Sequence, residues 1–292
     1  MERAPRLPAV AAVTPDHPAG HSQNGHSHPE AYWDGVGHAW ISSAPQRLWR
    51  EHTDRLQFAL LRRWIGIPKL EPHEPGPAVL KTDLFDEIAG RGIVGPLHRM
   101  GCRVNGVDVA PKTVAEACRR NPELHAVAAD IRSLPFADGT FDVVYSGSTL
   151  DHFDAAGEID RAIREIRRVL RPSGRLILTL DNPGNPIVRL RNGPLMGWLR
   201  RTGIVPYQVG VTLDRMALVD CLQNRGFSVE EVSGILHCPR ALAVLMSRFI
   251  QRGSIRLQES FLHHLMAWER LEHQPTRFLT GYFTAVLATR EG

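Results

Sequence analysis

The sequence predicts an α/β fold built on a doubly wound, mostly parallel sheet of seven strands. From residue 78 onwards short apolar runs alternate with amphipathic, helix-like stretches, and several of the runs end in an acidic residue. The length of 292 residues, with 43% hydrophobic and 23% charged residues, is typical of a globular chain with a sizeable core. The expected strands are residues 79–86, 103–109, 125–129, 141–146, 174–181, 227–235 and 280–288.

Composition divides the chain into three parts. Residues 1–29 are rich in Pro, Ala, Gly, Ser and His and lack periodicity, so we expect a flexible tail. Its histidines have no cysteine or carboxylate at a fixed spacing, and we expect no metal site. Residues 30–77 carry aromatic residues at helical spacing, which predicts an N-terminal helical cap. The main domain, 78–292, contains two long insertions, 182–211 and 239–276, which we interpret as lids or substrate-binding elements.

The helix expected between the fourth and fifth strands shows the pattern most clearly. Apolar residues recur there at helical spacing, and Asp154 is the expected N-cap. Arginines alternate with carboxylates on the other face, which we interpret as a salt-bridged, solvated surface rather than an anion-binding site. The apolar stripe comprises Ile159, Ala162, Ile163, Ile166, Val169 and Leu170.

Charge, cysteines and hydropathy exclude several classes of protein. No apolar run approaches the roughly 20 residues that a membrane-spanning helix needs. The four scattered cysteines form no Cys-x-x-Cys pair, and no secretory signal is evident, so we expect a cytoplasmic protein with reduced thiols. The net charge is only +4 and no concentrated basic tract occurs, so we do not expect nucleic-acid binding. The oligomeric state is left open.

Candidate ligand-binding residues cluster at the expected ends of the first three strands. Gly90 and Gly92 fall in the turn before a helix, where glycines let the backbone approach a ligand closely. Asp108 ends the second strand, where an acid can accept both hydroxyls of a ribose. Asp130 ends the third strand, where a carboxylate can meet an adenine amino group. The carboxyl ends of parallel strands form the usual ligand-binding edge of such a sheet.

Taken together, these motifs resemble the class I S-adenosylmethionine-dependent methyltransferases over residues 78–181, with a looser match to the end. The glycine-rich motif corresponds to Asp86-x-x-x-Gly90-x-Gly92, and the second-strand motif to Gly106-Val-Asp-Val-Ala-Pro111. The resemblance implies S-adenosylmethionine as cofactor and a Rossmann-like sheet whose last strand is antiparallel. It also implies that Gly90 and Gly92 pass the methionine part, that Asp108 holds the ribose, and that Asp130 and Ile131 frame the adenine; Val109 is a further expected cofactor contact. Asp86, Glu87 and Ser146 complete the expected cofactor contacts.

One position departs from the family pattern. The family usually has a further glycine two residues after the motif acid, where this chain has Ile88. A β-branched residue does not easily adopt positive φ, so either the turn differs or Asp83 is the equivalent acid. A methyltransferase-like protein that no longer binds the cofactor is therefore an alternative function.

The loop after the fourth strand contains the candidate catalytic residues. His152 is the candidate general base and Asp151 its orienting partner, although His152 can equally pack beside the cofactor or cap the next helix. The two insertions favour an enclosed pocket for a small or medium-sized acceptor, with O-methylation the first expectation; a nucleic-acid methyltransferase is a further alternative. The candidate acceptor-binding residues are Tyr32, Trp33, Asp181, Arg189 and Arg191.

Overall fold

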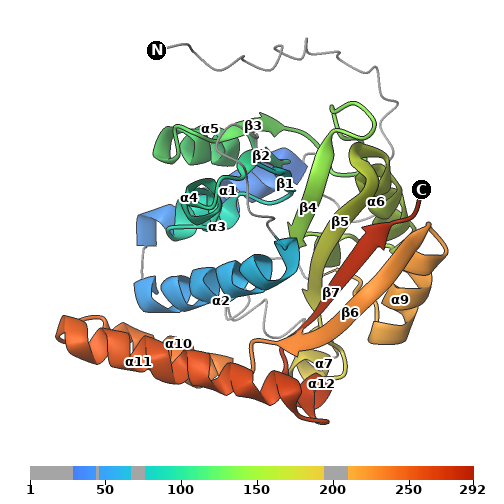
Figure 1. Ribbon diagram of the computed structural model, residues 1–292. Helices are drawn as coiled ribbons and strands as arrows, with labels where there is room; N and C mark the ends of the chain where they lie inside the picture. Colours follow the sequence, from blue (N-terminus) through green and yellow to red (C-terminus); the bar gives the residue numbers. More distant parts are fainter. Residues whose placement is uncertain (1–28, 44–45, 67–75, 194–209) are drawn as a thin grey trace.

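Seven strands form one sheet in the order β3-β2-β1-β4-β5-β7-β6 (Figure 1). The computed structural model describes residues 29–43, 46–66, 76–193 and 210–292, so nearly all of the expected tail and residues 194–209 of the first insertion lie outside the described residues. The strands are β1 Ala78–Lys81, β2 Arg103–Asp108, β3 His125–Ala128, β4 Phe141–Gly147, β5 Leu170–Asp181, β6 Phe227–Ile235 and β7 Phe283–Arg290.

Strands β1 to β5 pair in parallel, whereas β7 lies antiparallel between β5 and β6. This arrangement confirms the seven-stranded, Rossmann-like prediction with its antiparallel last strand. The chain moves outward from β1 to β2 and β3 on one side and continues through β4 on the other. The carboxyl ends of β1 and β4 therefore flank the point at which the strand order reverses, where open α/β sheets bind ligands.

Helices cover both faces of the sheet (Figure 1). One buried cluster joins α6 and α9 to the sheet, and a second joins α2, α4 and α5 to its other face. The helices are α1 Pro29–Ser43, α2 Arg47–Ile65, α3 Phe85–Ala89, α4 Val94–Arg99, α5 Pro111–Arg120, α6 Ala156–Val169, α7 Pro186–Asn192, α9 Arg215–Gln223, α10 Arg240–Ile250, α11 Ile255–Ala267 and α12 Arg277–Thr280, with 3₁₀ turns η1 Leu150–His152 and η2 Trp268–His273.

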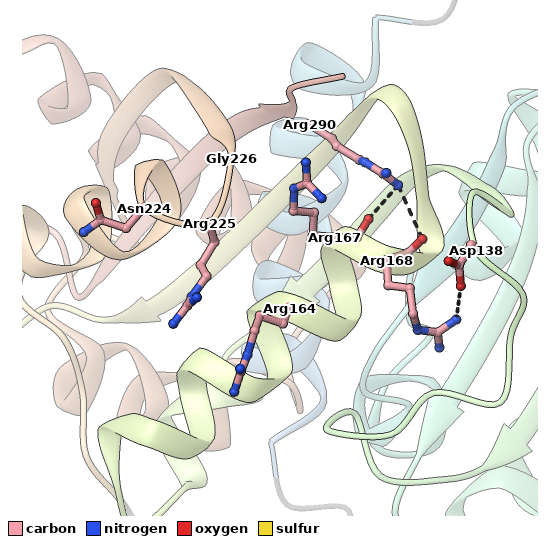
Figure 2. A pocket seen from close by; sticks show the side chains of 8 residues that line it. All are labelled: Asp138, Arg164, Arg167, Arg168, Asn224, Arg225, Gly226 and Arg290. Carbon is pink, nitrogen blue, oxygen red and sulfur yellow. Dashed lines mark hydrogen bonds and ion pairs between the residues drawn. The ribbon is translucent and has the colours of Figure 1, made fainter.

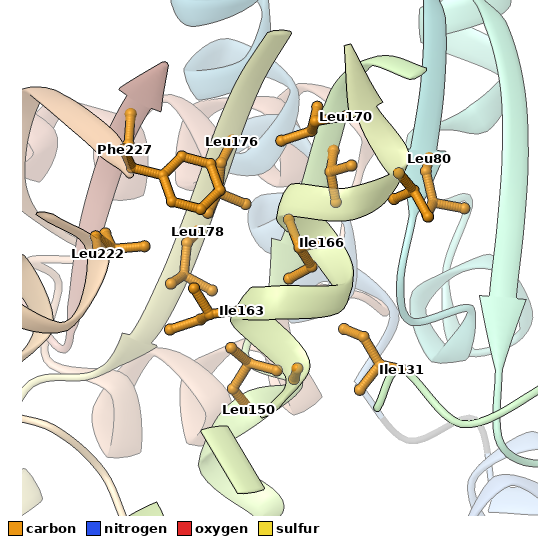
Figure 3. Close-up of a cluster of buried hydrophobic side chains, with 14 of the residues drawn as sticks. Leu80, Ile131, Leu150, Ile163, Ile166, Leu170, Leu176, Leu178, Leu222 and Phe227 are labelled. Carbon is orange, nitrogen blue, oxygen red and sulfur yellow. The ribbon is translucent and has the colours of Figure 1, made fainter. Parts of the chain in front are cut away.

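Helix α6 buries the apolar stripe that the sequence predicted, and Figure 3 shows Ile163 and Ile166 packed among the leucines of the sheet. The expected N-cap, Asp154, is wrong, because the helix begins at Ala156 with Ala155 in the N-cap position. The backbone amides of Asp154 and Ala155 instead donate to the carboxylate of Glu158, at 3.0 and 3.2 Å. The helix start is thus stabilised by an acid in its first turn.

Three strand boundaries differ from the prediction by three residues or more. Strand β5 begins at Leu170 rather than at residue 174. Strand β1 ends at Lys81 rather than at residue 86, because the carboxylate of Asp83 accepts the amide of Phe85 at 2.8 Å and begins α3. Strand β7 begins at Phe283 rather than at residue 280, because α12 occupies the preceding residues. Apolar character alone does not separate a short strand from the helix turn beside it.

Candidate functional site

The turn after β1 has a different geometry from the one expected from the sequence. Asp86 lies on α3, not at the end of the strand, and its carboxylate accepts from Gln57 of α2 at 2.8 Å and pairs with Arg50 at 3.3 Å. Ile88 also lies on α3 and is buried in the core. It does not adopt positive φ, so the conflict expected at this residue does not arise. The residues at the strand end itself are Lys81 and Asp83.

The glycine turn is bound by carboxylates of the chain itself. One oxygen of Asp54, on α2, accepts the amides of Arg91 and Gly92 at 3.0 and 3.1 Å. One oxygen of Glu87 accepts the amide of Ile93 at 3.0 Å. A Cβ on Gly90 would lie 2.7 Å from Asp54, and one on Gly92, which has φ +63°, would overlap Glu87. The glycines are therefore required for the close approach of two side chains.

Asp54, Asp83, Asp86 and Glu87 surround Lys81 and form what we call the acidic cluster. Lys81 is buried, with its Nζ 3.7 Å from Glu87. Burial alone lowers the pKa of Lys81, but the neighbouring carboxylates outweigh burial and raise it. Burial, and then the charge of Asp86, raise the pKa of Asp54 to about 7. The carboxylates outnumber the nearby cations Lys81 and Arg50, so this part of the edge favours a cationic group.

The acidic cluster also contains acceptors that are not satisfied. One carboxylate oxygen of Asp54 and one of Glu87 are buried and have no hydrogen-bond partner among the described residues. Buried polar atoms are usually paired, so unpaired ones commonly mark a place for a ligand or water. The sequence alone did not identify Asp54, because its position along α2 does not distinguish it from the other polar residues of that helix.

Asp108 lies where the sequence predicted, at the carboxyl end of β2. Its two oxygens accept the amides of Leu84 and Ala110, at 3.0 and 2.8 Å. Burial, and then the charge of Asp83, raise its pKa to about 7. Val109, beside it, is half-buried. Asp108 thus joins the turn after β1 to the turn after β2, next to the acidic cluster.

Asp130 and Ile131 follow β3. The Nε of Arg132 donates to both carboxylate oxygens of Asp130, at 2.9 and 3.0 Å. The Arg132 guanidinium lies 5.0 Å from the centre of the Phe153 ring, which brings the loops after β3 and β4 together. Ile131 belongs to the main buried cluster (Figure 3).

The loop after β4 separates the two candidate catalytic residues. The Asp151 carboxylate is buried and accepts the amide of Asp181 at 2.9 Å. Burial, and then Asp181, raise its pKa to about 6. The His152 ring instead contacts Trp33 of α1, with 4.7 Å between ring centres. Ser146 is fully buried on β4, and its hydroxyl has no hydrogen-bond partner in the described part of the chain.

Helix α1 lies across this edge of the sheet. Asp34 accepts the amide of Lys112 at the start of α5, at 3.0 Å, while Trp33 contacts His152 beyond β4. Tyr32 packs edge-on against Trp33, with 5.1 Å between ring centres. These contacts place the two predicted aromatic residues above the ends of β1, β2 and β4.

The predicted acceptor-binding residues after β5 are largely paired with each other. Arg191 forms a buried ion pair with Asp181 and donates to the Tyr282 hydroxyl at 2.6 Å. Arg189 is exposed. Asp181 and Arg191 therefore fix α7 to the end of β5.

Figure 2 shows an arginine-lined pocket at the opposite edge of the sheet, where β4 and β6 begin. Arg168 pairs there with Asp138 and Glu165, and Arg290 donates to backbone carbonyls at the end of α6. The arginines that line it are Arg164, Arg167, Arg168, Arg225 and Arg290. These pairings agree with the salt-bridged surface that the sequence predicted for α6.

Residues 89–178 match a family model described as a methyltransferase domain. An uncharacterized 37.1 kDa protein in transposon TN4556 of Streptomyces fradiae is 33% identical over 184 residues, 59% of this chain and 50% of that protein. A malonyl-[acyl-carrier protein] O-methyltransferase from Enterobacter lignolyticus is 37% identical over 104 residues, 35% of this chain and 40% of the relative.

The chain thus spans about half the length, or less, of these curated relatives. Among solved structures, the geranyl diphosphate C-methyltransferase from Streptomyces coelicolor A3(2), in complex with Mg²⁺, geranyl-S-thiolodiphosphate and S-adenosyl-L-homocysteine, has a TM-score of 0.50. It is 14% identical and covers 80% of this chain and 75% of its own. That likeness establishes the fold. No helix among the described residues is long and apolar enough to span a membrane.

Proposed function

Because the chain contains a methyltransferase domain of the class I, S-adenosylmethionine-dependent type, we propose that it transfers a methyl group to a small or medium-sized organic acceptor. The observation that carries the proposal is the convergence of Asp83, Asp108, Trp33 and His152 at the switch point of the sheet. A carboxylate at the end of β2 and the aromatic ring of Trp33 lie at one edge of the sheet, and a nucleoside cofactor would use such groups to bind its ribose and to exclude water.

The cofactor supplies an activated methyl group on a positively charged sulfur. The unpaired oxygens of Asp54 and Glu87 would accept its ammonium group, and the excess of carboxylates in the acidic cluster suits its positive charge. Asp108 would accept ribose hydroxyls through lone pairs that the two backbone amides leave open, with Val109 beside the ring. Asp130 and Ile131 would border the adenine. Gly90 and Gly92 would contribute indirectly, because the absence of a Cβ lets the carboxylates of Asp54 and Glu87 approach the turn.

The acceptor would bind beneath α1, between Trp33 and the loop after β4. Methyl transfer requires an in-line approach and exclusion of water, both of which a helix lying over the edge provides. His152 would take the proton of an acceptor hydroxyl or carboxyl group. Asp151 would hold the loop through the Asp181 amide rather than through His152. A nearby base supports O-methylation; the named relatives include both an O- and a C-methyltransferase.

Occupation of the glycine turn by Asp54 and Glu87 favours one alternative, a binding protein without methyltransferase activity. Failure of the folded protein to bind cofactor would support it. The excess of arginine over lysine motivates the other alternative, a nucleic-acid methyltransferase, but α1 covers the edge that a polymer would have to enter. Salt-sensitive retention on RNA or DNA would favour this second alternative. All four cysteines are free, and we place the protein in the cytoplasm.

The test is turnover of the full-length protein with S-adenosylmethionine and separate pools of carboxylic acids, phenols and carbon nucleophiles. Release of S-adenosylhomocysteine with a methylated product in any pool supports methyl transfer, and the pool identifies the atom. Cofactor binding without turnover in every pool would contradict the proposed acceptor class.

A further inference from the structure

Helix α10 exposes an apolar stripe. Leu242, Leu245, Met246 and Phe249 are 57%, 50%, 39% and 63% exposed, and their spacing of three and four residues puts them on one face. The opposite face buries Ala243 and Ser247, where the helix packs against α2 and α11. The exposed stripe is therefore not needed for the internal packing of the helix.

Two further elements also expose apolar residues. Ile255, at the start of α11, is 79% exposed, and α7 exposes Ile187 and Leu190. Val188 of α7 and Ala243 of α10 belong to the same buried cluster, so both helices pack onto one part of the core. Scattered apolar residues are normal on a surface, but a contiguous apolar face marks an interaction site.

The charged residues of the segment that carries α10 and the start of α11 have a single sign. No Asp or Glu occurs between Glu231 and Glu259, whereas this stretch contains four arginines. Arg248, Arg252 and Arg256 are exposed, and no carboxylate in the described part of the chain pairs with them. Arg189 of α7 is likewise exposed. On α6, by contrast, Arg164 and Arg168 pair with carboxylates.

We propose that α7, α10 and the first turn of α11 form a docking face for the surface of an anionic phospholipid membrane. An apolar stripe flanked by arginines matches that surface, since the side chains enter the acyl boundary while guanidinium groups contact lipid phosphates. A second copy of the chain fits less well, because it would set unpaired arginines against arginines. The ion pair of Arg191 with Asp181 fixes α7 to β5, so the docking face adjoins the candidate acceptor site.

The test is co-sedimentation of the full-length protein with vesicles, without cofactor, so that its result is independent of methyl transfer. The protein should sediment with vesicles of phosphatidylcholine and phosphatidylserine, and added salt should weaken this binding. The double variant Leu245→Ser, Phe249→Ser should bind roughly tenfold more weakly or worse. Met216→Ser, which changes a residue 59% exposed on α9, is the matched control and should bind like the wild type.

Three outcomes would overturn the proposal. They are absence of binding to anionic vesicles, equal binding to vesicles of phosphatidylcholine alone, and unchanged binding of the double variant. Self-association that the double variant abolishes, without vesicle binding, would assign the face to a second copy instead. Circular dichroism establishes that each variant is folded.

Discussion

Asp54 connects the N-terminal helices to the ligand-binding edge at the scale of a single residue. Its carboxylate joins α2 to the glycine turn, 38 residues further along the chain. Burial and Asp86 disfavour its ionised form, while the two amides favour it. The pKa of Asp54 is raised, so burial and the repulsion from Asp86 outweigh the two hydrogen bonds from the backbone amides. The attachment of α2 to the glycine turn therefore depends on the protonation state of Asp54.

This linkage gives a pH prediction. The pKa of Asp54 rises from 3.8 to about 7 on folding, so its contribution to the free energy of unfolding is present below pH about 4 and lost as the pH rises towards about 7. Asp54→Asn keeps an acceptor but does not titrate. Urea unfolding should show a smaller fall in stability between about pH 5 and about pH 8 for the variant than for the wild type. Parallel pH profiles would contradict the account.

The proposed binding of the cofactor ribose depends on Asp108. Asp108→Ala should weaken S-adenosylhomocysteine binding roughly ten- to a hundredfold, because charge-assisted hydrogen bonds contribute about 1.5 to 3 kcal/mol. Calorimetric titration measures this. Asp138→Ala, which removes a carboxylate on the opposite edge of the sheet, is the control. Unchanged affinity in folded Asp108→Ala would remove the residue from the cofactor site.

His152 has two competing roles, base and packing partner of Trp33. His152→Ala should lower turnover roughly 100-fold or more and leave cofactor affinity nearly intact if the ring removes a proton. His152→Phe keeps a ring against Trp33 but cannot accept a proton. Loss of turnover in both variants supports the base. Turnover retained in His152→Phe would reduce His152 to packing.

At the scale of elements, the sequence predicted most helices and strands but not the turn after β1. Helix α6 was predictable because its apolar stripe is regular and long. The end of the first strand was predicted five residues too late, at 86 instead of Lys81, because Leu84 and Phe85 continue the apolar run while the Asp83 side chain starts a helix. Local side-chain capping decided that boundary.

Helix α6 also provides a stability test. Ile163 is fully buried among the sheet residues, so Ile163→Ala should lower the free energy of unfolding by about 2–5 kcal/mol. Arg164→Ala on the exposed face of the same helix should change it by less than about 1 kcal/mol. Urea unfolding compares the two. A similar loss for both variants would show that α6 does not pack as described.

At the scale of the molecule, the order of motifs predicted the sheet, and the structure confirmed it. The acidic residues at the strand ends could be found because parallel strands place their carboxyl ends at one edge. Asp54 and the contact of Trp33 with His152 could not, because they depend on how α1 and α2 dock onto that edge. The spacing of residues along the sequence does not show how two distant helices pack onto the sheet.

The central claim is that this edge binds S-adenosylmethionine despite its unusual turn. Calorimetric titration of the purified full-length protein with S-adenosylmethionine, and separately with S-adenosylhomocysteine, tests it most directly. We expect saturable binding of both ligands at one site per chain, and weaker binding to the Asp108→Ala variant. Absence of heat from either ligand in a folded sample would contradict it and assign the glycine turn to Asp54 and Glu87 alone.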